Sequence, residues 1–377
     1  MTARTALQEN PVKESLTRLP PPLTTPTYRL DCSFEQNASL GPAFAGPYPD
    51  VPATPQKDYF GHPVASRFGI AASLLVNERW FEPYSRLGFD LLTYKTVRSR
   101  ERIAHPVPNW LYVDESSILR DATATIRSID TIPPDALNAT AAGSMGMPSS
   151  PPEVWRGDIR ACRAHLRAGR VLTVSVVGTA DAETTEIAFA DDYAALAGEV
   201  RDAGAQVVEL NLSCPNVGKR ESEVYLDTAS AVRIAGAARA AIGSAPLIVK
   251  IGQIEQRADM ETLLRALAGI VDGVVMINAP SRAFVNAAGA PTFGASRTHA
   301  GLMGGAVFDI AMACVRNAVE IVRRDDLAMK IIAVGGICTP ERARALIDAG
   351  AYAALAASAC AWDPYLAIRV KRFDPSL

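Results

Sequence analysis

The sequence predicts an α/β protein: an eight-stranded parallel (β/α)8 barrel preceded by a proline-rich N-terminal extension. Short apolar segments alternate with amphipathic helical segments from about residue 59 onward, which is typical of a parallel sheet. Several apolar segments end in polar residues or glycines, as strands that point into a shared site do. A single barrel of this type commonly takes about 250 residues, so the 377-residue chain has room for one barrel and an extension. An open doubly wound sheet is the structural alternative.

The predicted extension covers residues 1–58, and the barrel covers residues 59–377. Prolines crowd the segment between Pro20 and Pro55, without any regular apolar periodicity. Because proline fixes φ and removes a backbone donor, we expect an extended arm lying on or beside the barrel. The arm has too little pattern to form its own domain, and packing across the interface of a homodimer is one role that we expect for it.

Eight short apolar segments are the predicted barrel strands, and nearly all are followed by a helix or a long loop. In chain order they are Gly69–Ala72, Leu91–Lys95, Val171–Val177, Val207–Leu212, Leu247–Ile251, Gly273–Ile277, Ile331–Val334 and Ala353–Ala356. The predicted helices are Trp80–Leu87, Asp191–Ala203, Ser230–Ala241, Asp259–Ala268, Ile310–Arg323 and Pro340–Ala349.

Composition limits the kinds of partner. Lys and Arg number 38 against 40 for Asp and Glu, with no long basic run, so no nucleic-acid or membrane partner is expected and the ligand is a small molecule. The six cysteines include no C-x-x-C pair and the four histidines show no metal spacing, which predicts no metal site. No apolar run suits a signal peptide or a membrane span, so we expect a soluble cytoplasmic protein with reduced thiols.

The junction at residues 207–217 carries the most chemical information. It reads Val-Val-Glu-Leu-Asn-Leu-Ser-Cys-Pro-Asn-Val, an apolar strand that runs into a turn with Asn211, Ser213, Cys214 and Asn216. In a parallel barrel the C-terminal ends of the strands meet at one rim, where active sites lie. Two carboxamides and a thiol at this rim favour a site that binds a planar, amide-rich ligand and moves one proton.

Four other strand ends suit the same rim. The strands end in Lys95, Lys250, Asn278 and the pair Gly335-Gly336. A lone lysine at a strand end is most often a surface charge, but the barrel brings all four endings around one axis. The charged run of Arg98, Arg100 and Arg102 is predicted to be a solvated loop.

Two glycine turns in the last third suit a phosphate group. The segment 301–305 precedes the helix at Ile310, and Val334–Ile337 leads into the helix that Thr339 and Pro340 open. Glycines let backbone N–H groups approach an oxyanion, and a helix N-terminus adds a favourable partial charge. Barrels often bind phosphate after strands seven and eight, where Ser358 adds a hydroxyl. Either turn alone is read as structural; together they predict a phosphorylated ligand.

The segment from Phe60 to Cys360 resembles the dihydroorotate dehydrogenase family, FMN-containing TIM barrels of pyrimidine metabolism, and more distantly the flavin domain of dihydropyrimidine dehydrogenase. The most specific of the motifs behind this resemblance is Asn211-Leu212-Ser213-Cys214-Pro215-Asn216. The others, in the family's order, are Gly69-Ile70-Ala71-Ala72, Leu87-Gly88-Phe89, Tyr94-Lys95-Thr96, His105-Pro106-Val107-Pro108, Ser144-Met145-Gly146-Met147-Pro148, Val249-Lys250, Asn278, Gly304-Gly305 and Val334-Gly335-Gly336-Ile337.

The resemblance implies an FMN-dependent dehydrogenase that acts on CH–CH bonds. It implies Cys214 as the catalytic base and Lys95 as a catalytic residue near both flavin and substrate. The implied substrate contacts are Asn211, Asn216, Asn278, Ser144, Met145, Gly146 and Lys95. The implied FMN contacts are Ala71, Ala72, Lys95, Thr96, Asn211, Lys250, Gly304, Gly305, Gly335, Gly336 and Ser358.

These residue types suit the oxidation of a C–C bond beside a carbonyl. One carbon loses a proton, and its neighbour passes a hydride to flavin N5. A free thiol has a pKa near 8.5, and a nearby lysine lowers it toward neutral pH. The resemblance also places a cysteine at position 214 in the soluble branch of the family, whereas the membrane-associated quinone-reducing branch has serine there. We therefore expect a soluble electron acceptor or a partner protein.

Two departures bear on the substrate. Gly143 stands where the family usually has an asparagine, and Ala279 where it has a serine or threonine. Each unsatisfied polar group costs about 1 to 3 kcal/mol, so the substrate is dihydroorotate or a related cyclic amide. The alternatives are a dihydropyrimidine-type or specialised-metabolite flavin dehydrogenase, a Schiff-base aldolase with Lys250 as nucleophile, and a flavin-binding subunit without chemistry of its own.

Overall fold

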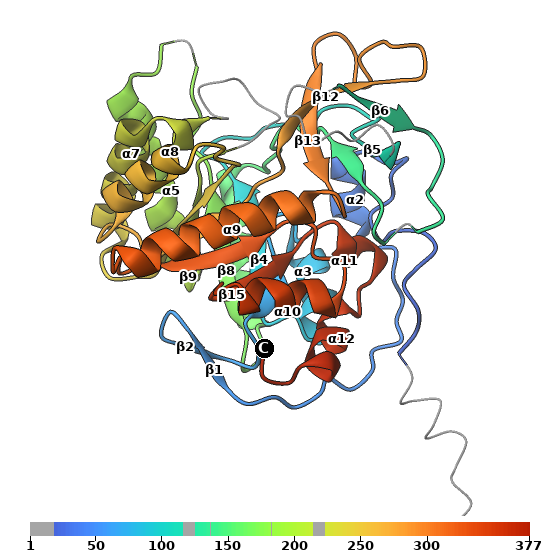
Figure 1. Ribbon diagram of the computed structural model, residues 1–377, viewed down its shortest axis with the longest axis horizontal. Coiled ribbons are helices and arrows are strands. Elements are labelled where there is room, and N and C mark those ends of the chain that lie inside the picture. Colours follow the sequence, from blue (N-terminus) through green and yellow to red (C-terminus); the bar gives the residue numbers. More distant parts are fainter. Residues whose placement is uncertain (1–18, 116–124, 136, 182, 214–222) are drawn as a thin grey trace, which may run out of the picture.

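Figure 1 shows a computed structural model, which describes residues 19–115, 125–135, 137–181, 183–213 and 223–377. Its centre is a closed barrel of eight parallel strands, arranged around the barrel in chain order. They are β3 (Phe68–Ile70), β4 (Leu91–Val97), β8 (Val171–Val176), β9 (Val207–Asn211), β10 (Leu247–Ile251), β11 (Gly273–Met276), β14 (Lys330–Val334) and β15 (Ala353–Ala356). The predicted fold class and all eight predicted strands are confirmed, so the strand C-termini share one rim.

The barrel interior is filled by its own cluster of buried side chains. Branched residues from several strands, among them Val171, Val207 and Ile248, form this cluster. The antiparallel pair β1 (Lys57–Tyr59) and β2 (His62–Val64) lies below the barrel in Figure 1 and adds Tyr59 to the cluster. The barrel is therefore closed at the N-terminal ends of its strands. A ligand would enter at the opposite end, where the strands have their C-termini.

The helices pack around the barrel with one apolar face inward. The six predicted helices are confirmed as α3 (Glu78–Arg86), α5 (Glu186–Ala203), α7 (Thr228–Ile242), α8 (Arg257–Leu267), α9 (Val307–Arg324) and α10 (Pro340–Asp348). Side chains of Asn77, Thr185, Asp227 and Thr339 accept backbone N–H groups at four of the N-termini. Further helical elements, not predicted from the sequence, are α4 (Pro152–Ala164), η2 (Val224–Leu226), α11 (Ala359–Trp362) and α12 (Leu366–Phe373).

A second, five-stranded sheet lies above the barrel mouth in Figure 1 and was not predicted. Its strands are β5 (Trp110–Val113), β6 (Thr125–Ile129), β7 (Ala141–Gly143), β12 (Ser281–Val285) and β13 (His299–Met303). The expectation that residues 301–303 belong to a turn is wrong, because they pair with Ala141–Gly143. The sheet comes from two loops of the barrel, the one between β4 and β8 and the one between β11 and β14, and it covers the predicted site from above in Figure 1.

The N-terminal arm lies along the barrel of its own chain, with backbone hydrogen bonds from Leu23 and Thr27 to Trp362 and Ala361. It is not wholly extended, because α2 (Phe34–Leu40) forms a short helix that Ser33 caps. The Thr27 hydroxyl bonds to the Tyr84 hydroxyl over 2.7 Å, which fastens the arm to α3.

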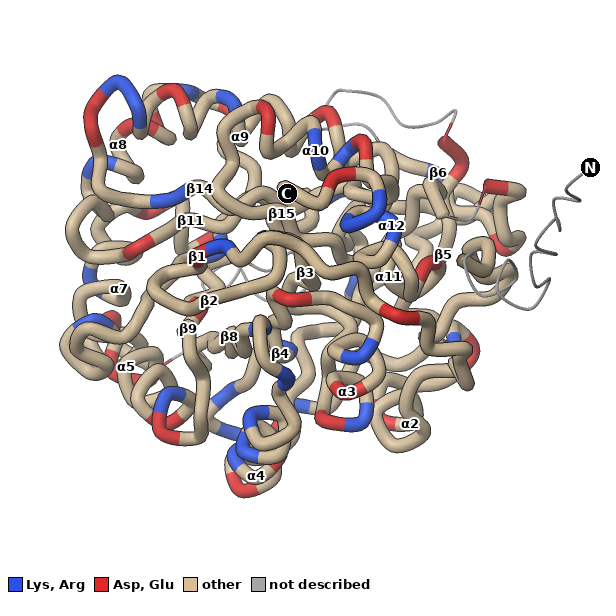
Figure 2. The backbone as a smooth tube through the Cα atoms, turned by 90° about the horizontal axis from the view of Figure 1, so that it is seen from below, with Lys and Arg blue, Asp and Glu red and all other residues tan. Residues whose placement is uncertain are grey.

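Charge is mixed over the molecule. Figure 2 shows acidic and basic residues interspersed along the outer helices in the view from below. None of the helices in the described ranges is both long and apolar enough to cross a membrane. The same ranges hold no cluster of three or more His, Cys, Asp or Glu side chains arranged for a metal ion.

Candidate active site

A pocket with an empty volume of about 1240 Å³ opens between the barrel rim and the five-stranded sheet. This volume includes open solvent at the mouth of the pocket. Most of its wall comes from residues at or just after the C-terminal ends of barrel strands, as the fold predicts. The predicted site residues that line it are Ala72, Lys95, Thr96, Met145, Asn211, Lys250, Asn278, Gly304, Gly335, Gly336 and Ser358.

Four predicted site residues lie close by but outside the pocket wall. Ala71 packs in the barrel interior, and its N–H donates to the carbonyl of Ala356. Ser144 and Gly146 both lie against His105, with 3.4 Å between Ser144 Oγ and His105 Nδ1. The fourth is Gly305, whose N–H donates to the Asn138 carbonyl. Two further predicted residues, Cys214 and Asn216, lie outside the described residues.

Two lysines contribute positive charge to one pocket. Lys250 is only 5% exposed, and it stands opposite Asn211 in the pairing of β10 with β9. Lys95 reaches the same pocket from β4. Two ammonium groups in a largely buried pocket attract an anionic ligand or stabilise negative charge that develops there.

The carboxamides of Asn211 and Asn278 form a connected network at the rim. Asn278 Nδ2 donates to Asn211 Oδ1 over 3.4 Å and to the Ser213 carbonyl, while Asn278 Oδ1 accepts the Ala279 N–H over 3.0 Å. The Ser213 hydroxyl is buried and has no hydrogen-bond partner among the described residues. The network fixes both carboxamides, and it leaves a buried hydroxyl available beside them.

The two glycine turns approach each other closely, and Arg342 joins them. Its Nη1 donates to the carbonyl of Gly336 over 2.9 Å and to that of Gly305 over 3.4 Å. A Cβ at Gly304 would lie 2.1 Å from the Ala139 carbonyl oxygen, and one at Gly336 would lie 2.4 Å from the Phe308 nitrogen. The glycines are thus required by close packing of the chain itself. Sequence reasoning missed Arg342 because an arginine in a helix has no local signature of this role.

The segment from Gly143 to Ser149 forms a second wall, and buried Arg98 holds it. Arg98 Nε donates to the Met147 carbonyl over 3.2 Å, and Arg98 N donates to Ser149 Oγ over 3.0 Å. Arg98 is fully buried, so its prediction as part of a solvated loop is wrong. At Gly143 an added Cβ would lie 2.6 Å from Met303 Cε, so the Met303 thioether fills the space that a side chain at position 143 would take.

The arm and the second sheet supply aromatic walls that sequence reasoning missed. Tyr28 and Phe34 of the arm and Trp110 of β5 line the pocket. The Tyr28 ring lies 5.7 Å from the Trp110 ring and 6.0 Å from the Trp80 ring. These contacts join segments far apart in the chain, so no local pattern predicts them.

Comparison with known proteins identifies relatives across most of the chain. Residues 128–372 match the family model described as dihydroorotate dehydrogenase. The dihydroorotate dehydrogenase of Dictyostelium discoideum is 32% identical over 364 residues, which cover 92% of this chain and 97% of that protein. The catalytic subunit of dihydroorotate dehydrogenase B (NAD+) from Maridesulfovibrio salexigens is 27% identical over 50% of this chain and 60% of its own length. Among solved structures, the DHODH of Eimeria tenella in complex with ferulenol has a TM-score of 0.66 at 20% identity, with coverage of 86% of this chain and 85% of that one.

Proposed function

Because the chain belongs to the dihydroorotate dehydrogenase family and is an oxidoreductase of that type, we propose that it uses FMN to oxidise or reduce the C–C bond next to a carbonyl in dihydroorotate or a related cyclic amide. The observation that carries this proposal is the pocket at the barrel rim. It gathers two lysines, two connected carboxamides and two glycine turns around one space.

The residues present fit FMN. Gly335 and Gly336 line the pocket, and their N–H groups have no hydrogen-bond partner among the described residues. These two donors are therefore available to a phosphate group. Ser358 adds a hydroxyl at the same end of the barrel, while Lys95 and Lys250 suit the electron-rich edge of a reduced flavin. When bound, FMN supplies a hydride acceptor.

The protein's own part in the reaction is to hold the substrate and to move a proton. We assign the proton transfer to Cys214, whose thiolate takes a proton from the substrate carbon next to the one that loses the hydride. The carboxamides of Asn211, Asn216 and Asn278 carry the donor and acceptor types that the edge of a cyclic amide requires. Met145 lines the pocket beside them. Ser144 and Gly146 support this wall from behind.

The remaining features of the proposal concern the surroundings of the enzyme. A soluble electron acceptor or an electron-transfer partner protein takes the electrons after each turnover. We propose a homodimer in the cytoplasm, with no nucleic-acid or membrane partner, in keeping with the mixed surface charge. Size-exclusion chromatography with light scattering tests the dimer.

Anaerobic titration of the purified protein tests the function. We expect a yellow protein with one FMN per chain, whose flavin absorbance bleaches when dihydroorotate or another dihydropyrimidine in a panel of cyclic amides is added. A colourless protein that FMN does not reconstitute would contradict the proposal. So would flavin that no cyclic amide reduces and that no oxidised analogue reoxidises.

The same preparation separates the alternatives. A Schiff-base aldolase would give a substrate adduct on Lys250 that borohydride traps, and the comparisons offer no support for that reading. A flavin-binding subunit without chemistry would hold FMN that stays oxidised with every substrate tried.

A further inference from the structure

The glycine turn after β14 needs to be held in one shape if it is to bind an anion. Gly335 and Gly336 both have positive φ values, of 134° and 65°. Glycine adopts many backbone conformations at little cost, so two glycines in a row allow the peptide planes of this turn to rotate. A rotated peptide would present its carbonyl oxygen to the pocket in place of its N–H group. The orientation of these peptides therefore decides whether the turn attracts or repels a phosphate.

Arg342 of α10 holds this turn from behind. Its Nη1 donates to the Gly336 carbonyl over 2.9 Å, and that carbonyl accepts no other hydrogen bond from the described residues. The same Nη1 donates over 3.4 Å to the Gly305 carbonyl, which also accepts the Phe308 N–H over 3.2 Å at the start of α9. The guanidinium lies over the Phe308 ring, 4.9 Å from its centre. Arg342 thus connects a turn that could rotate to a helix that is fixed.

The bond to the Gly336 carbonyl also sets the direction of the next N–H group. The peptide between Gly336 and Ile337 is trans, so its carbonyl and its N–H point in opposite directions. Ile337 lines the pocket, whereas Arg342 lies outside the pocket wall. With the carbonyl turned toward Arg342, the Ile337 N–H is turned toward the pocket. Like the N–H groups of Gly335 and Gly336, it has no hydrogen-bond partner in the described part of the chain.

We propose that Arg342 is a positioning residue for the phosphate group of FMN. By holding the Gly336 carbonyl, it keeps the Ile337 N–H directed at the pocket, next to the N–H groups of the two glycines. Hydrogen bonds from a charged donor are about twice as strong as those between neutral groups, which suits a guanidinium to the selection of one orientation of a glycine peptide. The inference rests on the proposed function, because it takes FMN as the ligand, and it adds a residue outside the pocket that determines how tightly the phosphate binds.

The test compares binding of FMN with binding of riboflavin, which differs from FMN only in lacking the phosphate group. Each full-length apoprotein is titrated with each flavin, and the quenching of flavin fluorescence reports binding. Thermal unfolding of the same apoproteins measures their stability. A defect in the phosphate site should affect FMN alone, whereas a general defect of the pocket should affect both flavins.

Three variants are compared with the parent. Arg342→Met keeps an aliphatic side chain beside Phe308 but removes the donors and the charge, whereas Arg342→Lys keeps a charged donor. Arg344→Met is the matched control, because Arg344 lies on the same helix but outside the pocket wall, where it pairs with Asp348 and Asp374. The control therefore makes the same substitution without a contact to the glycine turns.

We expect Arg342→Met to weaken FMN binding by about tenfold or more, the loss expected for one hydrogen bond to a charged group, and riboflavin binding by less than about twofold. Arg342→Lys should lose less FMN affinity than Arg342→Met, because its ammonium can still donate to one carbonyl. Arg344→Met should bind both flavins as the parent does. If riboflavin binds the parent too weakly to measure, a loss of FMN affinity at an unchanged melting temperature supports the inference, and a loss of both overturns it.

Four other results would overturn the inference. They are equal losses of FMN and riboflavin affinity in Arg342→Met, unchanged FMN affinity in that variant, an equal loss of FMN affinity in Arg342→Lys, and an equal loss in Arg344→Met. The proposed function fails separately, because a parent apoprotein that binds neither flavin would contradict FMN as the cofactor. A parent and an Arg342→Met variant that bind FMN equally well would contradict only the role of Arg342.

Discussion

At the scale of single residues, the general base has the largest expected effect on chemistry. Replacing Cys214 with alanine should leave FMN bound and slow flavin reduction by the substrate by about two to four orders of magnitude, the usual span for losing a general base. The reason is that the proposed mechanism gives Cys214 the substrate proton and no contact with the phosphate. Stopped-flow measurement of anaerobic flavin bleaching checks the rate, and the flavin absorbance of the purified variant checks the binding.

A second cysteine provides the control for this prediction. Cys162 is fully buried on α4, and burial raises the pKa of its thiol far above neutral pH. The substrate should therefore reduce the flavin of Cys162→Ala at the rate measured for the parent enzyme. If Cys214→Ala did the same, another group would be the base.

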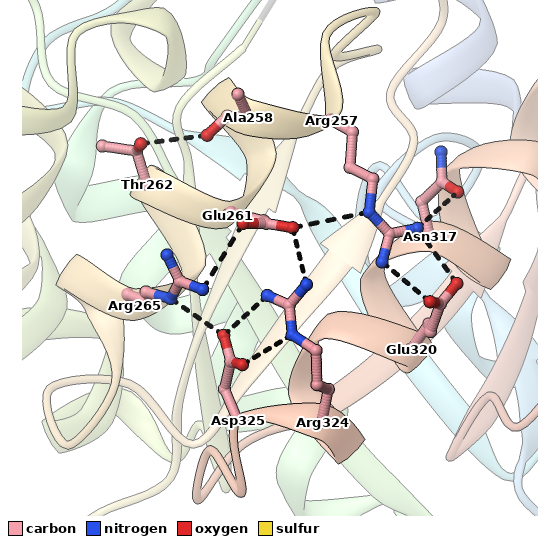
Figure 3. Close-up of polar contacts among 9 residues, drawn as sticks. All are labelled: Arg257, Ala258, Glu261, Thr262, Arg265, Asn317, Glu320, Arg324 and Asp325. Atoms are coloured by element: carbon pink, nitrogen blue, oxygen red, sulfur yellow. Dashed lines mark hydrogen bonds and ion pairs between the residues drawn. The ribbon is translucent and has the colours of Figure 1, made fainter.

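At the scale of elements, an ion-pair network connects α8 to the end of α9, as Figure 3 shows. Arg324 donates to Glu261 over 2.9 Å and to Asp325 over 2.8 Å, and Arg265 donates to Asp325 over 2.8 Å. Hydrogen bonds from Arg324 are the main cause that lowers the pKa of both Glu261 and Asp325, whose ordinary values are 4.5 and 3.8. The network is exposed to solvent, so each pair contributes little by itself.

The depressed pKa values predict how this network responds to acid. A carboxylate whose pKa is lowered in the folded state stabilises the fold above its unfolded pKa, and that contribution is lost as pH falls through the folded value. Arg324→Gln should therefore lower the melting temperature by a few degrees at neutral pH, and the difference from the parent should shrink progressively below pH 4.5. Thermal unfolding at a series of pH values measures it.

Salt and a neighbouring arginine give the controls for the network. One molar salt should reduce the same difference, because it screens exposed charges. Arg316 lies exposed on the same helix and has no ion pair in the described part of the chain. Arg316→Gln should therefore have the melting temperature of the parent at every pH. A difference for Arg324→Gln that persists into strong acid would mean that its side chain stabilises by packing.

At the scale of the whole molecule, the barrel was predictable and its additions were not. Buried parallel strands are short apolar runs in the sequence, so β8, β10 and the other barrel strands were correctly located. The five-stranded sheet has no such signature, because its strands are short and one of them, Ala141–Gly143, consists of small residues. Its pairing depends on contacts between distant loops.

The same division holds within the site. Lys95, Lys250 and Asn278 were predicted because each ends a recognisable strand, and the fold alone then brings them together. Arg98 was wrongly predicted to lie in a solvated loop, and the burial of Glu209 was not predicted, because the burial of both depends on packing against distant segments. The sequence shows that a residue is charged, but only the packed structure shows what faces that charge.

The N-terminal arm, residues 19–58, is expected to stabilise both the fold and the pocket, and Tyr28 is the residue that tests this. Tyr28 packs between Trp80 and Trp110 and lines the pocket, while its hydroxyl has no hydrogen-bond partner in the described ranges. Tyr28→Ala should lower the free energy of unfolding by roughly 3 kcal/mol, as other large-to-small aromatic substitutions do, and should weaken FMN binding. Tyr28→Phe keeps the ring and should match the parent in both urea unfolding and flavin titration. If Tyr28→Ala were as stable as the parent, the contacts of Tyr28 would not stabilise the protein. The aromatic wall of the pocket would then not depend on the arm.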